Sequence, residues 1–90
     1  MPYIKKEFRS VLESNCGLAG LLEGMSRINP TVGDLNYLIT RICHEYIKIH
    51  GMSYQASNDL VGVLDCAKME LYRRIISKYE DKKIKENGDV

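Results

Sequence analysis

The sequence is short of the residues that usually mark a catalytic site or a membrane segment. It contains no tryptophan, one phenylalanine, two histidines and three cysteines among its 90 residues. No stretch approaches the ~20 apolar residues that a membrane-spanning helix needs. The first ten residues, MPYIKKEFRS, also lack the apolar core of a secretory signal peptide. These absences predict a cytoplasmic protein that has no membrane partner.

The cysteines are too few and too scattered for a disulfide framework or a metal site. Cys16, Cys43 and Cys66 lie far apart and are odd in number. Disulfide-rich domains use an even set of cysteines, and zinc sites commonly use CxxC pairs. We therefore expect free thiols in a reducing cytoplasm, and we expect neither a cofactor nor a metal.

The charges nearly balance. Thirteen lysines and arginines face twelve aspartates and glutamates, so the formal net charge is +1. A protein with so small a net charge has no overall field that attracts nucleic acid. A nucleic-acid partner is therefore not expected, and only a local basic patch remains as a candidate for binding anions.

The strongest helical pattern lies in the middle of the chain. Apolar residues recur there every three or four positions, at Leu35, Leu38, Ile39, Ile42, Tyr46 and Ile49. Residues 29–33 form the break before this helix, because Pro30 disfavours helical geometry in the residue that precedes it. Asp34 is predicted to be the N-cap, and Gly51 is predicted to end the helix.

A second long helix is predicted from Ser57 to Tyr79, roughly 35 Å at 1.5 Å per residue. Its apolar stripe consists of Leu60, Leu64, Ala67, Leu71 and Ile75, with Ile76 and Tyr79 added near the end. Ser53 or Ser57 is the candidate for its N-cap. The tail EDKKIKENGDV is mostly charged, so its composition alone predicts a frayed end.

Two weaker patterns come earlier in the chain. Residues 1–12 are predicted to form a short helix or an arm, because helical spacing relates Ile4, Phe8, Val11 and Leu12. A further stripe consists of Leu18, Leu21, Leu22, Met25 and Ile28. Glycine interrupts that stripe, and each internal glycine weakens a helix by about 1 kcal/mol. Gly20 and Gly24 share one face, where either another backbone approaches closely or the helix is simply marginal.

Together these patterns predict one helical domain over residues 1–90. The expected fold is all-α, a small three- to four-helix bundle with one long C-terminal helix. A chain of this length buries only about 60 to 65% of the surface that its unfolded form exposes, so a monomer would have modest stability. We therefore expect oligomerisation to complete the fold.

The motifs that would indicate an enzyme are incomplete. HEYIKIH begins with His44 and Glu45, but Lys48 stands where the HExxH zinc motif needs its second histidine. GLAGLLEG has neither the GxGxxG pattern nor a following lysine. Small helical nucleotide pyrophosphohydrolases hold magnesium with carboxylates, for which the candidates here are Glu45, Asp65 and Glu70. Their EExxE-type cluster is absent, so we favour a protein without catalytic residues.

The densest polar cluster lies on the predicted long helix. Arginine has a planar fork that suits phosphate and carboxylate groups, and tyrosine rings offer a face for stacking. The candidate ligand-binding residues are Arg41, Asp65, Glu70, Tyr72, Arg73 and Arg74. The alternative is pairing within one helix, for example between Glu70 and the two arginines three and four residues later.

Several stretches resemble an uncharacterised family of small helical proteins from bacteria, archaea and phages. These stretches are PYIKKE, GDLNYLITRIC, NDLVGVLDCAKMELYRR and YEDKKIKENGDV. The resemblance covers roughly residues 33–90, whereas residues 8–32 depart from it. It implies a helical fold and no known activity. A tail that belongs to a family pattern is also expected to be ordered, so the resemblance predicts at least partial order from Glu80 to Asp89.

Three functions are compatible with these features. The leading hypothesis is a non-enzymatic assembly or interaction module that forms a homo-oligomer, a dimer or larger. The first alternative is a protein that binds or sequesters a small anionic ligand, such as a nucleotide, through the arginines and Tyr72. The second alternative is a metal-dependent nucleotide hydrolase that uses Glu45, Asp65 and Glu70.

Overall fold

The structure is a computed structural model that describes residues 4–89, and all regular structure in that range is helical. The elements are α1 (Lys6–Ser14), α2 (Leu18–Ile28), α3 (Val32–His50), α4 (Tyr54–Leu71), η1 (Tyr72–Ile76) and α5 (Ser77–Asn87). The predicted all-α class and the long C-terminal helix are confirmed. The described chain forms two compact units, one over residues 4–53 and one over residues 54–89. The single domain over residues 1–90 stays a prediction.

A capping box starts α3. The backbone N–H of Asp34 donates to Thr31 Oγ1 at 3.1 Å, and the backbone N–H of Thr31 donates to Asp34 Oδ2 at 2.9 Å. Thr31 is therefore the N-cap, and the prediction that Asp34 holds this position is wrong. Asp34 is the third helical residue. Its carboxylate accepts from the backbone N–H of Thr31 and interacts favourably with the positive end of the helix dipole.

Gly51 ends α3 as predicted. Its φ is 84°, a left-handed value that residues with a Cβ rarely adopt. Its backbone N–H donates to the carbonyl of Ile47 at 2.7 Å, so one of the last carbonyls of the helix has a partner. Local hydrogen bonds and a glycine therefore define both ends of α3.

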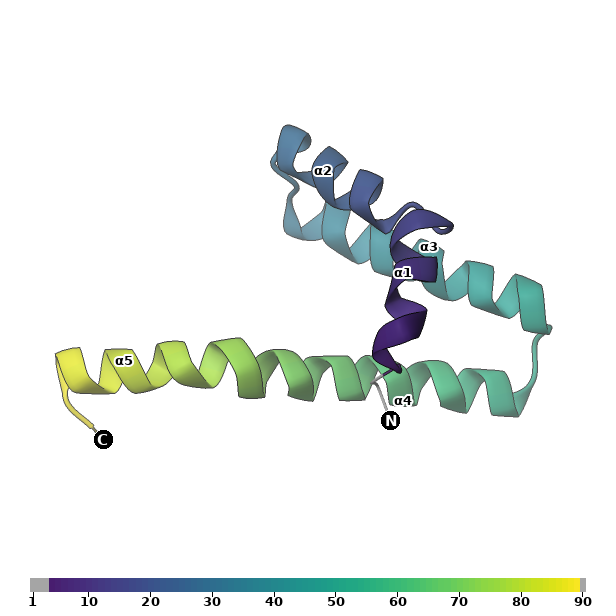
Figure 1. Cartoon of the computed structure of the whole chain (residues 1–90). Coiled ribbons are helices and arrows are strands. Elements are labelled where there is room, and N and C mark those ends of the chain that lie inside the picture. Colours follow the sequence, from purple (N-terminus) through teal and green to yellow (C-terminus); the bar gives the residue numbers. More distant parts are fainter. Residues whose placement is uncertain (1–3, 90) are drawn as a thin grey trace. The chain divides into compact units, whose positions relative to one another are not determined.

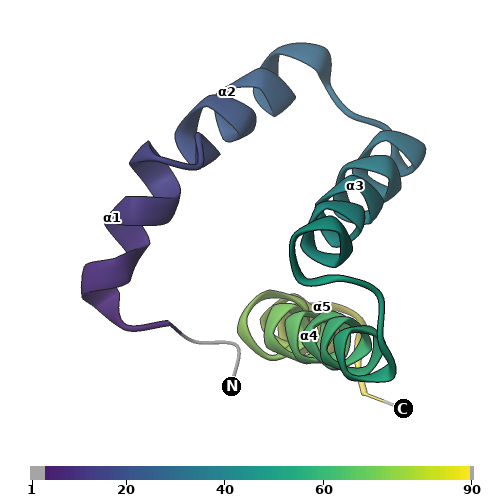
Figure 2. The same ribbon diagram turned by 90° about the vertical axis from the view of Figure 1, so that its right-hand side faces the viewer.

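The two short helices of the first unit are α1 and α2, and they contact each other. Figure 2 shows them one after the other along the chain. Gly17 joins them with a φ of 70°, which glycine tolerates. Among residues 4–89, the close approach considered for Gly20 and Gly24 is not found, since a Cβ at either position would meet none of their heavy atoms within 4 Å.

The second unit is one continuous helical rod. It begins at Tyr54, so Ser53 holds the N-cap position and Ser57 lies inside the helix. Its 34 residues correspond to about 50 Å. Figure 1 shows α4 and α5 along a single line, and Figure 2 shows them one behind the other. The helix continues to Asn87 and ends at Gly88, which confirms the order predicted for most of the charged tail.

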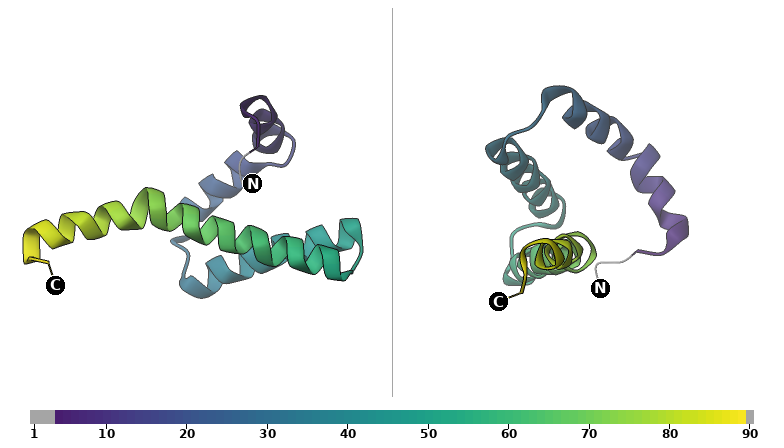
Figure 3. Two further views of the ribbon diagram at one scale, coloured as in Figure 1. Left: turned by 90° about the horizontal axis from the view of Figure 1, so that it is seen from below. Right: turned by 90° about the vertical axis from the view of Figure 1, so that its left-hand side faces the viewer.

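A π-helical segment, η1, interrupts this rod near its middle. The backbone N–H of Ser77 donates to the carbonyl of Tyr72, five residues earlier instead of the four of an α-helix. The rod changes direction slightly between α4 and α5, where this segment lies (Figure 3). Such bends are typical of π segments, because the wider turn disturbs the regular hydrogen-bond ladder. The sequence pattern does not predict this element.

Most apolar side chains of the described residues are exposed. Ala56 is the single buried residue between residues 4 and 89. On the second unit, the exposed fraction is 50% for Leu71, 61% for Ile75 and 60% for Tyr79. Large apolar groups seldom stay in water in such numbers, because each costs free energy there.

Candidate functional site

The predicted polar cluster lies where α4 meets η1. The Arg73 guanidinium donates from Nη2 to Glu70 Oε1 at 3.2 Å, and the Nε of Arg74 pairs with the same oxygen. The Glu70 side chain is 24% exposed, whereas those of Arg73 and Arg74 are 69% and 61% exposed. The cluster is therefore a half-buried carboxylate beneath two solvated guanidinium groups.

This geometry contains the intrahelical pairing that the sequence offered as an alternative. Both arginines lie at the helical spacing from Glu70, three and four residues away, and exposed pairs of this kind contribute only tenths of a kcal/mol. Together, the Glu70 carboxylate and the two guanidinium groups carry a formal charge of +1. Binding of an anionic ligand by these residues stays a prediction.

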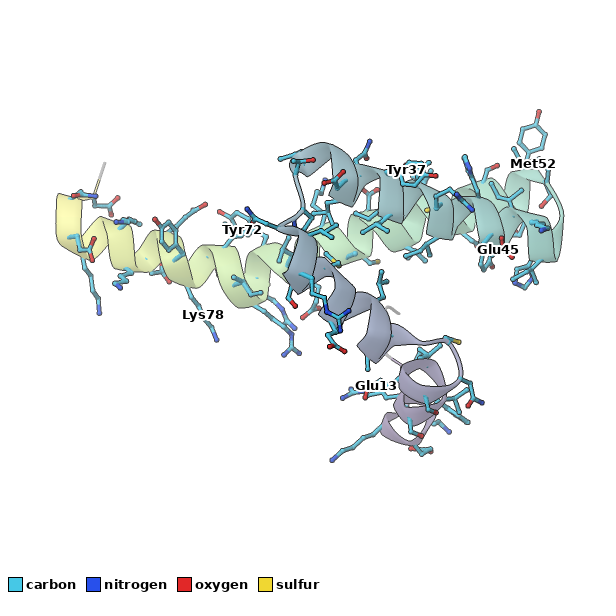
Figure 4. The ribbon with its side chains drawn as sticks, turned by 90° about the horizontal axis from the view of Figure 1, so that it is seen from above. Glu13, Tyr37, Glu45, Met52, Tyr72 and Lys78 are labelled. Atoms are coloured by element: carbon cyan, nitrogen blue, oxygen red, sulfur yellow. The ribbon has the colours of Figure 1, made fainter. Side chains whose placement is uncertain are left out.

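Tyr72 projects from the second unit and pairs across the π segment. Its hydroxyl donates to Glu80 Oε2 at 2.9 Å. This hydrogen bond raises the pKa of the Tyr72 phenol above its ordinary value of about 10. The negative charge of Glu80 acts in the same direction, because ionisation would place two negative charges side by side. In Figure 4, Tyr72 and Lys78 point away from each other on this helix.

Two predicted site residues lie away from this cluster in the sequence and have their own partners. Asp65 forms an ion pair with Lys68, with 3.7 Å between Oδ1 and Nζ. Arg41 belongs to α3 in the first unit, where its Nη1 donates to the Tyr37 hydroxyl at 2.8 Å. The Arg41 guanidinium carbon also lies 5.7 Å from the centre of the Tyr37 ring, which is a cation–π distance. The structure thus brings together Glu70, Arg73 and Arg74. Tyr72 contacts Glu80 instead.

The other candidates for chemistry have ordinary surroundings. His44 is exposed on α3, and the rings of Tyr46 and His50 lie 4.2 Å apart on the same helix. Glu45 projects from α3 as well (Figure 4). All three cysteines are free thiols. Within residues 4–89, no group of three or more His, Cys, Asp or Glu side chains is placed to hold a metal ion.

The sequence does not predict Glu80 as a partner of Tyr72. Eight residues separate them, and in an uninterrupted α-helix they would be about 80° apart around the axis. Nothing in the usual pair spacings points to such a contact, because it depends on η1. The Tyr37–Arg41 pair, four residues apart, follows the ordinary helical rule.

A comparison with protein families identifies the chain. The family described as "Domain of unknown function (DUF6899)" matches residues 1–90. The chain belongs to this family. The resemblance to an uncharacterised helical family is therefore confirmed, while the occurrence of DUF6899 in bacteria, archaea and phages stays a prediction. Comparisons with curated proteins and with solved structures found no match.

None of the helices between residues 4 and 89 combines the length and the apolar character that crossing a bilayer requires.

Proposed function

We propose that this chain is a non-enzymatic assembly module that forms a homo-oligomer through its second unit. The contact surface is the apolar stripe, defined as Leu60, Leu64, Ala67, Leu71, Ile75 and Tyr79. The observation that carries the proposal is that this stripe runs along a single helix, and that between residues 54 and 89 its unit contains no other element to cover it.

The exposure of the stripe supports this proposal. Half or more of the surface of Leu71, Ile75 and Tyr79 is in contact with water. Burying a side chain of this size contributes about 1.5 to 3 kcal/mol. A second copy of the chain offers an equal stripe, so pairing would remove both from water at once.

The low intrinsic stability of isolated helices supports it as well. Helices owe most of their stability in proteins to packing of an apolar face, and not to the propensity of their residues. The α5 segment is rich in charge and has two apolar side chains, Tyr79 and Ile84. A partner along the stripe would therefore stabilise the helix as well as the oligomer.

We place the module in the cytoplasm. The three free cysteines support this location, since secreted domains of this size usually use their cysteines in disulfides. The proposal requires no cofactor and no catalytic residue.

Two matched variants test the proposal. Leu71→Lys puts a charge into the stripe, whereas Met69→Lys puts the same charge on an exposed residue about 160° away around the same helix. Leu71→Lys is expected to weaken self-association by about 100-fold or more, and Met69→Lys is expected to leave it nearly unchanged. Sedimentation velocity at micromolar concentrations measures both. Equal behaviour of the two variants would exclude the stripe as the contact surface.

A further inference from the structure

We propose that the helices of the second unit pair antiparallel with each other in this homo-oligomer. The inference rests on the proposed function, and it specifies the partner of the stripe as a second copy of the same helix in reversed direction. Two features of the described residues lead to it. One is the uneven distribution of charge along the helix, and the other is the π segment at its centre.

The two halves of the helix have opposite net charge. Residues 54–70 contain three carboxylates and one lysine, which are Asp59, Asp65, Glu70 and Lys68. Residues 71–87 contain three carboxylates, Glu80, Asp81 and Glu86, and six basic residues, Arg73, Arg74, Lys78, Lys82, Lys83 and Lys85. Charges beside an apolar contact set the orientation of paired helices. Antiparallel pairing places the acidic half beside the basic half, while parallel pairing places the six basic residues beside their own copies.

The π segment brings the stripe into line across both halves. The spacing of four residues from Ala67 to Leu71, Ile75 and Tyr79 would turn the stripe by about 40° per step in a regular α-helix. Tyr79 would then lie about 80° away from Leu71. The wider turn of η1 accommodates about one extra residue, which turns α5 back by about 100°. Tyr79 therefore returns to within about 20° of Leu71, and the stripe is straight.

The hydrogen bond between Tyr72 and Glu80 supports this alignment. These residues are also eight apart, so they share a face only when one extra residue is accommodated between them. The distance of 2.9 Å between the Tyr72 hydroxyl and Glu80 Oε2 shows that they do. The stripe residues Leu71 and Tyr79 have the same separation across the same segment.

The straight stripe is compatible with reversal of direction. When two copies are paired antiparallel about a point near Met69 and Glu70, Leu60 of one copy lies opposite Tyr79 of the other. Leu64 then lies opposite Ile75, and Leu71 lies near the centre. Each large residue near one end therefore meets a large residue from the other end, as a two-fold symmetric contact requires.

Distances between single spin labels test the orientation in the full-length chain. The background is a cysteine-free chain with Cys16→Ser, Cys43→Ala and Cys66→Ala, whose oligomer mass is first compared with that of the unmodified chain. One label is attached in each of three separate variants, Asn58→Cys, Lys68→Cys and Lys82→Cys, all at exposed positions of the helix. Pulsed electron paramagnetic resonance then measures the distance between the two copies of each label.

Antiparallel pairing predicts about 35 Å between the labels at position 58 and also between those at position 82, with a short distance at position 68. Distances below about 20 Å at all three positions would indicate parallel pairing and would overturn the inference while leaving the proposed function intact. Long distances at all three positions would overturn it as well, since the helices would not lie side by side. A monomeric mass of the unmodified chain would overturn the proposed function itself.

Discussion

The first and second units each contain one long helix, α3 and the rod from Tyr54 to Asn87, and the two differ in what sets their geometry. The apolar residues of α3 repeat regularly, and its ends are closed by the Thr31–Asp34 capping box and by Gly51. From Ala67 to Tyr79, the apolar residues of the rod recur every four positions, slightly more than the 3.6 residues of an α-helical turn, and we infer that the π segment corrects their alignment. Residues of the chain therefore fix where α3 begins and ends. The alignment of the apolar residues along the rod, in contrast, matters chiefly for a partner that contacts the whole stripe.

The largest effect is expected when the alignment of the stripe is broken. Deleting Lys68 turns Leu71 by about 100° relative to Leu60 and Leu64, because the deletion lies between them. We expect this deletion to weaken self-association by about 100-fold or more, since each copy loses the burial of a leucine. Sedimentation velocity is the measurement.

Deleting Arg74 is the matched control for this prediction. Like the Lys68 deletion, the Arg74 deletion removes one basic residue from the rod. Unlike the Lys68 deletion, it removes the extra residue that η1 accommodates. The helix can then become regular while Leu71 and Tyr79 stay aligned at a spacing of seven. Self-association is expected to persist. If the Arg74 deletion abolishes it and the Lys68 deletion does not, alignment by the π segment is wrong.

A smaller effect is expected at the start of α3. Thr31→Ala removes the hydroxyl that accepts from the Asp34 N–H, so the free energy of unfolding should fall by about 1 kcal/mol. Hydrogen exchange of the Asp34 amide should become faster, and the oligomer mass should not change. Thr40→Ala is the control, because that hydroxyl donates to the Asn36 carbonyl inside the helix and alanine is a better helix former. Slower exchange at Asp34 in Thr31→Ala would contradict the capping box.

The charged cluster is expected to contribute less. Glu70→Gln removes the charge that two exposed arginines share, and the free energy of unfolding should fall by less than about 1 kcal/mol. Asp65→Asn, which affects the more exposed pair with Lys68, should have a smaller effect still. Urea denaturation measures both. A loss of several kcal/mol in Glu70→Gln would instead indicate that this carboxylate is essential to a binding site or a contact surface.

The same region allows a test of the anionic-ligand alternative. The assembly account predicts no thermal shift of the chain with a panel of nucleotides. A shift that Arg74→Ala abolishes and Lys68→Ala preserves would favour ligand binding at Arg74 over assembly as the role of this cluster.

The smallest effect is expected in the ionisation of Tyr72. Its pKa is raised by the hydrogen bond to Glu80, so the stabilisation from this bond is fully present below the unfolded value of about 10. It is lost as the pH rises through the higher pKa of the folded chain. In Glu80→Gln, the Tyr72 pKa should move down towards its ordinary value. A carbon-13 NMR titration of the tyrosine rings measures the difference, and an unchanged Tyr72 pKa would contradict the contact.

The helices themselves could be predicted from the sequence because local spacing decides them. The repeat of apolar residues from Leu35 to Ile49 and the glycine after His50 define α3 well. The N-cap was misplaced because Thr31 and Asp34 are both good capping residues. Their spacing of three is that of a capping box, and this spacing identifies Thr31 as the cap.

The π segment and its contact could not be predicted in the same way. Glu70 and the two arginines follow the ordinary spacing of helical pairs, so the sequence predicts their contact as an alternative. The contact between Tyr72 and Glu80 depends on one extra residue in a turn, for which no residue type in YRRII is diagnostic. The available signal was the spacing of four residues from Ala67 to Tyr79, which exceeds the 3.6 residues of an α-helical turn. This spacing indicates a π segment only if the stripe is assumed to be straight.

The mass of the unmodified chain in solution tests the central claim most directly. Sedimentation equilibrium over micromolar concentrations should give a mass of at least twice the 10.3 kDa of one chain. It should fall towards 10.3 kDa on dilution, in Leu71→Lys and in the Lys68 deletion. A mass of 10.3 kDa at every concentration would contradict the account, because the stripe of the second unit would then have no second copy to cover it.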